Sequence, residues 1–322
     1  MITEIAPSVY RLESVFGGRP LYQYLLAGDR CVLVDTGVNE TPHTIILPAL
    51  ERLGIPRERL ALIVVTHCDY DHQGGNHAIK AACPRALLSC GRLDQQLVAD
   101  PHALFNRRYD AYRADHVIGY DDVTKAAILE HAGPAQPLDM TWAGGETFAV
   151  ANDWEVELLH VPGHSHGHLS LYDQHNRALY TGDAVHWSYY PGAEDGQPKL
   201  PPTYLYVNSY LGTIRALGLL DATLLAGAHW PLQRGDEVAA FLAESRSFVE
   251  RANDAILDEL DRAGIALTLR EIIERVGPRL GDWPGEVNIE LVYAFAGHME
   301  RLVSHTQVAQ VIDGQPTRYR RA

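Results

Sequence analysis

The sequence contains few cysteines, and their spacing matches neither a disulfide framework nor a redox motif. The 322 residues include only Cys31, Cys68, Cys83 and Cys90, and no two of them form a CxxC pair. The N-terminus lacks a basic and apolar secretory signal, and no apolar run is long enough to span a bilayer. We therefore expect a cytoplasmic protein without a membrane segment.

Positive charge is also scarce. The chain has 27 Lys and Arg against 41 Asp and Glu, which gives a formal net charge of −14 at pH 7. A general nucleic-acid binder needs a basic surface that displaces counterions from phosphates. The composition therefore argues against nucleic acid as a partner and favours a small-molecule substrate.

What the chain does have is a loop of metal-ligand residues, Thr66–Asn76, directly after an apolar run typical of a buried strand. Within six positions the loop carries His67, Asp69, Asp71 and His72. Divalent metals bind imidazole nitrogen and carboxylate oxygen, and one turn can supply both to two neighbouring ions. The loop predicts a metal site at the rim of a sheet.

Three later apolar runs end in the same kinds of residue. His164 stands in a Pro-Gly-His motif, Asp183 follows a glycine, and His229 follows a Gly-Ala pair. Strands that each deliver a histidine or an aspartate at their end can gather these side chains along one edge of a sheet. The pattern therefore predicts one metal centre built from distant parts of the chain.

The order of these motifs resembles that of the metallo-β-lactamase superfamily of dinuclear metallohydrolases. The segment Cys31–Gly37 also resembles the early strand and turn of that family, and the resemblance covers roughly residues 5 to 232. It implies an α/β fold, an αββα sandwich of the metallo-β-lactamase type. It also implies a role for each motif residue: His67, Asp69 and His164 on a first ion, Asp71, His72 and His229 on a second, Asp183 bridging both, and Asp35 behind the site to orient a ligand.

The chain departs from the family pattern at one position. The usual loop reads His-x-His-x-Asp-His, whereas here Asp69 takes the place of the second histidine. A further carboxylate makes the first position harder and more negative, which shifts its preference from zinc toward iron or manganese. The flavodiiron branch of the superfamily is similar, with a glutamate there. We expect two divalent ions, zinc first, with iron or manganese as the alternatives.

The resemblance implies a metal-dependent hydrolase. Two ions would share a bridging water and lower its pKa, so that hydroxide attacks an ester, a lactone or a thioester. We expect no protein nucleophile, and Asp71 is the candidate proton donor, with a pocket tyrosine as the alternative. Two other activities stay open: a phosphodiesterase or nuclease of the same superfamily, and a non-hydrolytic diiron enzyme.

Two segments are candidates for the substrate pocket. Residues 92–137 are predicted to form a largely helical insertion, whose aromatic and cationic side chains would either cover the site or pack as a surface insertion. The stretch after the Gly-Asp motif carries His186, Trp187, Tyr189 and Tyr190, which we expect to line the pocket.

The chain is predicted to have two domains. Residues 1–234 would be catalytic, with a second half-sandwich that begins near Leu138, and residues 235–322 would form a smaller, mostly helical domain. Its predicted helices and terminal hairpin resemble a winged helix, an appendage known in one branch of the superfamily. Residues 236–322 contain 10 Arg and no Lys against 15 Asp and Glu, so packing or homodimer formation is favoured over nucleic-acid binding.

Overall fold

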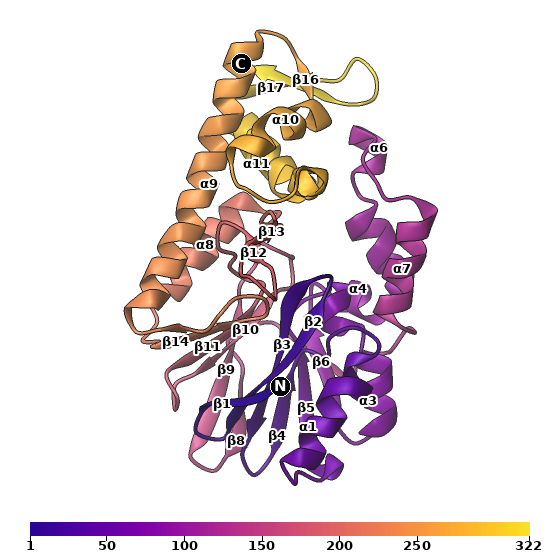
Figure 1. Cartoon of the computed structure of the whole chain (residues 1–322), viewed down its shortest axis with the longest axis vertical. Helices are drawn as coiled ribbons and strands as arrows, with labels where there is room; N and C mark the ends of the chain where they lie inside the picture. The colour runs from indigo at the N-terminus through magenta and orange to yellow at the C-terminus, as the bar shows by residue number, and fades with distance from the viewer.

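The computed structural model describes residues 1–322 and contains two facing β-sheets, flanked by helices and extended by a mostly helical C-terminal part (Figure 1). The first sheet follows chain order, antiparallel from β1 to β4 and parallel from β4 to β7. Its strands are β1 (Ile2–Ala6), β2 (Val9–Phe16), β3 (Arg19–Ala27), β4 (Cys31–Val34), β5 (Leu60–Val65), β6 (Leu87–Gly91) and β7 (Met140–Trp142).

The second sheet has the strand order β15-β14-β11-β10-β9-β8. It begins at Thr147 and not near Leu138 as predicted, because Met140–Trp142 pairs in parallel with β6 and so belongs to the first sheet. A separate pair, β12 and β13, lies outside both sheets. The strands are β8 (Thr147–Ala151), β9 (Trp154–His160), β10 (Leu169–Asp173), β11 (Ala178–Gly182), β12 (Tyr190–Pro191), β13 (Pro198–Leu200), β14 (Leu224–Gly227) and β15 (Gln233–Arg234).

Along each central strand, successive side chains pack alternately against the other sheet and against the helices. On β4, Val32 and Val34 lie in the cluster between the sheets, whereas Leu33 lies in the cluster on the helix side. Ile63 and Val64 divide in the same way on β5. Successive side chains of a strand point to opposite faces, so a strand buried on both faces reads as a continuous apolar run. The predicted αββα sandwich is confirmed.

Helices occupy the crossovers and the predicted insertion. A π-helical turn, Pro42–Ile46, leads into α1 (Leu47–Arg52), and the metal loop contains α2 (Tyr70–Gln73) and leads into α3 (Asn76–Ala82). The insertion is helical, as predicted. Its elements are α4 (Gln95–Ala99), α5 (Pro101–Leu104), a π-helical turn (Phe105–Tyr109), α6 (Arg113–His116) and α7 (Asp122–Ala132), and α8 (Val207–Leu217) follows in the second half.

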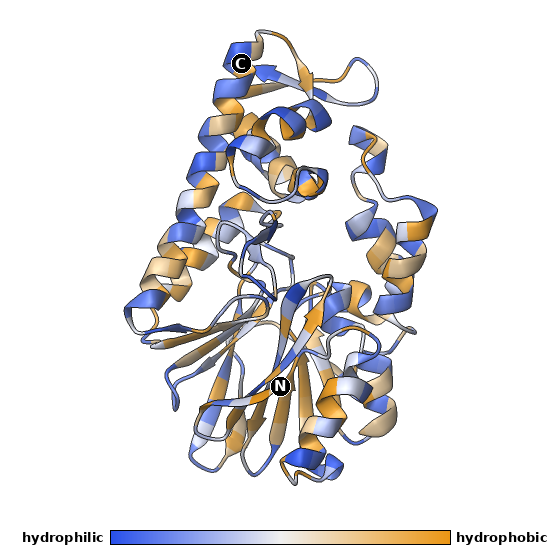
Figure 2. Ribbon diagram, viewed as in Figure 1, coloured by the Kyte–Doolittle hydropathy of each residue, from blue (hydrophilic) through white to orange (hydrophobic).

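The C-terminal part begins with the long helix α9 (Asp236–Ala263), whose mixed apolar and polar surface is visible in Figure 2. Thr268 and Glu271 form a capping box at the start of α10, as the local sequence Thr-Leu-Arg-Glu indicates. The two-residue strand β16 was missed, because so short a strand has no readable period. The remaining elements are β16 (Leu267–Thr268), α10 (Leu269–Val276), two 3₁₀ turns (Gly277–Arg279 and Gly285–Leu291), α11 (Val292–Ser304), β17 (Val308–Val311) and β18 (Arg318–Arg321).

The C-terminal part shares its hydrophobic core with the sandwich. Phe241 and Phe248 of α9 belong to the same buried cluster as Trp230, which follows β14. The winged-helix assignment and the domain boundary at residues 234/235 stay predictions. No helix in the structure combines the length and the apolar character needed to cross a lipid bilayer.

Candidate metal centre

The predicted ligands come from strand ends of both sheets, which meet at one rim of the sandwich. His67 follows β5, His164 lies between β9 and β10, and His229 follows β14. All seven predicted ligands fall into overlapping groups whose ligand atoms lie within 4.8 Å of one another. These groups are His67, Asp69 and His164; His67, His72 and Asp183; Asp71, His72 and His229; and His164, Asp183 and His186.

A tight turn places His164. Gly163 has a φ of +153°, and a Cβ on this residue would lie 2.7 Å from the Cα of Tyr210. Its carbonyl accepts hydrogen bonds from the backbone amides of Leu205 and Tyr206, at 2.9 and 2.8 Å. Only glycine tolerates both the positive φ and the close approach. The glycine of the Pro-Gly-His motif is therefore required by the backbone path into the site.

All four predicted histidine ligands are oriented the same way. In each ring Nδ1 lies within hydrogen-bond distance of an oxygen atom, which leaves Nε2 to face the interior of the site. Fixing one ring nitrogen in this way selects the tautomer that binds metal through the other. The Nδ1 partners are Thr66 Oγ1 for His67 (3.0 Å), Asp35 Oδ2 for His72 (2.9 Å), the Thr203 carbonyl for His164 (3.1 Å) and the Pro20 carbonyl for His229 (2.7 Å).

Asp35 lies behind the ligands, where the prediction places it. It has a φ of +63°, and its carboxylate accepts hydrogen bonds from the backbone amide (2.7 Å) and hydroxyl (2.9 Å) of Thr66. The same carboxylate contacts His72, and Thr66 contacts His67. Asp35 therefore orients one ligand directly and a second through Thr66.

The group around the second metal position fits a divalent ion. His229 Nε2 lies 3.5 Å from both Asp71 Oδ2 and Asp183 Oδ2, and His72 Nε2 lies 3.7 Å from Asp183 Oδ1. Two ligands at about 2.0–2.1 Å from one tetrahedral ion lie roughly 3.4 Å apart. His72 Nε2, His229 Nε2 and Asp183 Oδ1 are buried without a hydrogen-bond partner. Such atoms are costly unless a ligand satisfies them.

The group around the first metal position is different. His67 Nε2 has no partner and lies 3.5 Å from Asp69 Oδ2, but that same oxygen is only 2.8 Å from His164 Nε2. Asp69 is also paired with the guanidinium of Arg108, and it accepts a hydrogen bond from the hydroxyl of Tyr109 at 3.0 Å. The carboxylate that departs from the family pattern is therefore bound by two residues of the insertion.

Charge and burial act in opposite directions on the ionisable groups of the rim. Burial alone would raise the pKa of Asp69, but Arg108 and His164 outweigh it and hold this pKa well below its usual range. Burial alone would lower the pKa of His72, but the carboxylates of Asp35, Asp71 and Asp183 raise it to about 10. The rim without metal is thus strongly negative around His72.

Two more buried histidines lie against the ligands. His186 has no hydrogen-bond partner on either ring nitrogen, and its Nε2 lies 3.9 Å from Asp183 Oδ2. Because it groups with His164 and Asp183, it can serve as a further ligand rather than as the predicted pocket residue. The ring of His168 stacks on that of His67 with centroids 4.6 Å apart, so it packs behind a ligand.

A cavity of about 240 Å³ opens onto the rim. Its lining comes from three parts of the chain: the sandwich, the insertion and the C-terminal part. Aspartates of the rim and tyrosines together make up about half of the lining residues. The lining residues are Arg19, Asp69, Tyr70, Asp71, Arg108, Tyr109, Tyr120, Thr124, Ile128, Asp183, Tyr190, Leu200, Thr203, Glu290 and Tyr293.

Of the four predicted pocket residues, only Tyr190 lines this cavity, and its hydroxyl donates to Asp183 Oδ2 at 2.9 Å. His186 is fully buried. Trp187 stacks on Tyr189 with centroids 5.5 Å apart and contacts Phe241 of α9, so the pair packs against the helix. The chain turns between Tyr189 and Tyr190 into β12, which no local pattern indicates.

The cavity also contains residues that the sequence did not single out. Arg19 starts β3 after the turn Gly17-Gly18, and its guanidinium lies 3.8 Å from Asp71 and over the ring of Tyr190. Glu290 accepts hydrogen bonds from the Tyr120 hydroxyl at 3.0 and 3.1 Å. Neither residue stands near a metal motif in the sequence, so no local signal could have revealed its position.

A serine pattern missed at the sequence level lies in the loop of His164. Gly163, Ser165 and Gly167 match the G-x-S-x-G arrangement of a nucleophilic serine. However, the loop joins two strands instead of a strand and a helix, and the Ser165 hydroxyl donates to Asp94. The backbone amide of Gly167 donates to the same carboxylate at 2.7 Å. These hydrogen bonds to Asp94 fix the conformation of the loop and engage the Ser165 hydroxyl. Water therefore remains the expected nucleophile.

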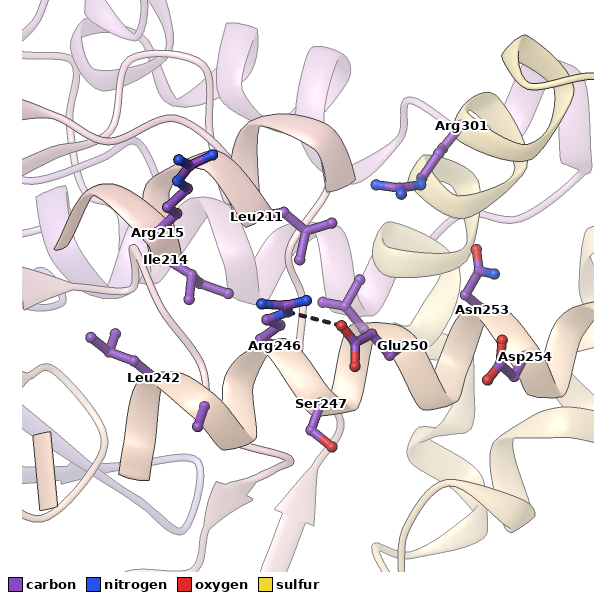
Figure 3. Close-up of a pocket in the computed structure, with 12 residues that line it drawn as sticks. Leu211, Ile214, Arg215, Leu242, Arg246, Ser247, Glu250, Asn253, Asp254 and Arg301 are labelled. Carbon is purple, nitrogen blue, oxygen red and sulfur yellow. Dashed lines mark hydrogen bonds and ion pairs between the residues drawn. The ribbon is translucent and has the colours of Figure 1, made fainter. Parts of the chain in front are cut away.

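Another cavity, of about 760 Å³, lies away from the rim between α8, α9 and α11 (Figure 3). Leu211, Ile214 and Leu242 contribute apolar surface, and Arg215 and Arg301 stand at its edge. None of the predicted ligands lines it. The metal chemistry therefore belongs to the smaller cavity.

Residues 17–229 match the family model of the metallo-β-lactamase superfamily. The chain belongs to this superfamily, and the fold and the buried histidine–aspartate clusters are those of a metallohydrolase.

Comparison with known proteins gives more distant similarities. The chain is 27% identical over 157 residues to a hydroxyacylglutathione hydrolase of Aeromonas hydrophila, covering 49% of this chain and 43% of that protein. It is 24% identical over 222 residues to the acyl-coenzyme A thioesterase MBLAC2 of Bos taurus, covering 65% and 71%. A metallo-beta-lactamase family protein from Thermus thermophilus has a similar structure, with a TM-score of 0.75, 22% identity, and coverage of 99% of this chain and 100% of that one. This last similarity concerns the fold alone.

Proposed function

We propose that this protein is a dinuclear metallohydrolase that cleaves an acyl bond, with a thioester or an ester as substrate. The observation that supports it most directly is the orientation of the imidazoles. Each is held at Nδ1, and the Nε2 atoms of His72 and His229 lie 3.5 to 3.9 Å from carboxylate oxygens of Asp71 and Asp183. Two divalent ions bound here would lower the pKa of a water and polarise the oxygen of the bond under attack. Zinc is the proposed metal, because imidazole and carboxylate both suit it.

The chain itself would hold and orient the substrate. Arg19 keeps its positive charge, because Asp71 and the neighbouring tyrosines outweigh the effect of burial on its pKa. Its guanidinium lines the cavity 3.8 Å from Asp71, so it can bind an anionic group of the substrate or the charge that develops on its oxygen. Tyr190 remains a neutral phenol, since burial and Asp183 raise its pKa well above the usual value.

The leaving group needs a proton. Asp71 is the proposed donor, since it lines the cavity beside the second metal position. Tyr190 is the alternative, since its hydroxyl already donates to Asp183. Replacement of Tyr190 by Phe separates the two: a large loss of turnover assigns the proton to Tyr190, and a small one leaves it with Asp71.

The choice of an acyl substrate rests on the relatives. A hydroxyacylglutathione hydrolase and an acyl-coenzyme A thioesterase both carry names that describe thioester cleavage. The chain spans less than half of the first, so its activity transfers only as a proposal. Neither name describes phosphodiester cleavage. We further propose a cytoplasmic enzyme, with small molecules as substrates, that forms a homodimer through the C-terminal part.

The decisive experiment combines elemental analysis with a substrate panel. Protein purified without added metal should contain close to two zinc per chain and should hydrolyse thioesters faster than phosphodiesters. Asp183→Asn is the matched negative control. Metal-free protein that still hydrolyses thioesters, or preferential cleavage of phosphodiesters, would contradict the proposal. Iron or manganese in place of zinc would transfer the assignment to the non-hydrolytic alternative and require an oxygen-dependent assay.

A further inference from the structure

Arg108 lies inside the metal centre, although it comes from the insertion and not from a metal motif. Its side chain is 5% exposed. Its Nε and Nη2 pair with the two oxygens of Asp69, the second at 2.8 Å, and Nη1 donates to the backbone carbonyl of His164 at 3.0 Å. A planar guanidinium bound to both oxygens of a carboxylate is among the strongest polar contacts in proteins. Arg108 is therefore firmly held at this place.

The same guanidinium also lies within hydrogen-bond distance of His164 Nε2, the nitrogen that would bind metal. Arg108 Nη2 lies 3.0 Å from His164 Nε2, and Asp69 Oδ2 lies 2.8 Å from that nitrogen. If Nε2 is unprotonated, its lone pair accepts from Arg108, and if it is protonated, it donates to Asp69. In either state the lone pair is not free for a metal ion. His164 and Asp69 can thus bind a first ion only after Arg108 moves.

The second metal position has no such competitor. His72 Nε2, His229 Nε2 and Asp183 Oδ1 have no hydrogen-bond partner. The arginine beside this position is Arg19, whose guanidinium lies 3.8 Å from Asp71 Oδ2 and makes no hydrogen bond to it. Ligand atoms there are spaced for an ion, at 3.5 to 3.9 Å, whereas Asp69 and His164 are spaced for a hydrogen bond. The ligand atoms of the second position are therefore arranged to bind an ion, whereas Asp69 and His164 of the first position are hydrogen-bonded.

We propose that Arg108 is an internal cation that competes with the first metal ion, so that the two metal positions bind with unequal affinity. The second position, with Asp71, His72, His229 and Asp183, fills first and tightly. The first position fills weakly, because the incoming ion must displace a buried guanidinium from Asp69 and is repelled by its charge. This inference rests on the proposed dinuclear function.

Arg108 would then also compensate the unusual Asp69. A carboxylate in place of the family histidine adds a negative charge to the first position, and Arg108 supplies the opposite charge within hydrogen-bond distance. Tyr109, the next residue of the same π-helical turn, donates to the same carboxylate. Arg108 is thus a positioning residue for Asp69, and the insertion regulates the metal content of the rim.

The test is a metal titration of the full-length protein after chelator treatment. Zn²⁺ is added in competition with a chromophoric chelator, and the two dissociation constants are fitted. We expect the wild-type constants to differ by at least about 100-fold, and Arg108→Met to tighten the weaker site by at least about tenfold with the tighter one unchanged. Arg108→Lys keeps the charge but loses the bidentate contact with Asp69. Its dissociation constant for the weaker site should lie between those of the wild type and Arg108→Met.

Arg107→Met is the matched control, since Arg107 lies on the same turn and its side chain bonds the exposed Gln96. Its two constants should equal those of the wild type. Two equally tight sites in the wild type would overturn the inference even if no Arg108 variant folds. Unchanged constants in a folded Arg108→Met would overturn it as well. Wild-type protein that binds no Zn²⁺ at all would instead refute the proposed function.

Discussion

The two metal positions of the rim are built by different parts of the fold. Loops of the sandwich alone supply the second position, where His72 Nε2, His229 Nε2 and Asp183 Oδ1 have no hydrogen-bond partner and the ligand atoms lie at metal spacing. The insertion also contributes to the first position, where Arg108 and Tyr109 bind Asp69. The motif residues thus fix which groups meet, while a segment without any motif determines whether those groups are free to bind metal.

Removing the shared ligand should have the largest effect, because Asp183 belongs to both halves of the rim. We expect Asp183→Asn to lower kcat by at least roughly 1,000-fold, beyond the 10–100-fold typical of residues behind a metal ligand. The fold should persist, since the change is isosteric. Steady-state kinetics and thermal unfolding measure the two effects. Full activity in the variant would refute a dinuclear mechanism.

A matched pair of variants should separate the two positions. Asp35 supports His72 of the second position, and Asp94 holds the loop of His164 at the first. Asp35→Asn should weaken the tight Zn²⁺ site by roughly 10–100-fold, whereas Asp94→Asn should leave it unchanged. Chelator competition gives both constants. The same loss in both variants would mean that the positions are not independent.

Arg19 tests the substrate side of the second position. Arg19→Met should lower kcat/KM by about tenfold, which corresponds to about 1.4 kcal/mol, and leave the Zn²⁺ content intact. The loss should be larger for substrates with an anionic group than for neutral esters. Arg19→Lys should restore part of the rate. An equal loss for charged and neutral substrates would argue that Arg19 acts on the developing charge instead.

Glu290 tests the contribution of the C-terminal part. Its carboxylate binds Tyr120 of the insertion inside the cavity, and burial raises its pKa. Glu290→Gln keeps the shape and removes the charge, so we expect a change of only a few-fold in KM and none in metal content. Glu286→Gln is the control, because Glu286 lies on the same 3₁₀ turn but is exposed. A loss of bound metal in Glu290→Gln would contradict a role confined to substrate.

The smallest effect on turnover is expected at His298, where the C-terminal part is bonded to the sandwich half through the Tyr204 hydroxyl at 2.9 Å. Burial lowers the pKa of His298 to about 3, so the unfolded chain takes up the proton first as the pH falls. Stability should therefore be lost below about pH 6.5, by up to about 1.4 kcal/mol per pH unit. His298→Gln should flatten this slope in urea unfolding. An unchanged slope would assign the acid sensitivity to other buried histidines.

Much of this molecule could be predicted from local patterns. Buried strands such as Leu60–Val65 read as apolar runs because both faces of the strand are covered. The helices of the C-terminal part followed from periodicity and from the capping box at Thr268. Short strands such as β12 and β16 were not predicted, because two residues show no periodicity.

The chemistry of the rim could be read from the sequence motifs: they show which histidines and aspartates stand at strand ends, and that Asp69 replaces a family histidine. These are properties of short segments and their order. By contrast, the folded structure was needed to show that Arg19, Arg108 and Glu290 enter the cavity and that Trp187 turns away from it. The physical reason is that a cavity wall needs only one side chain from each of several distant elements, held there by packing, and a single residue leaves no pattern in the sequence.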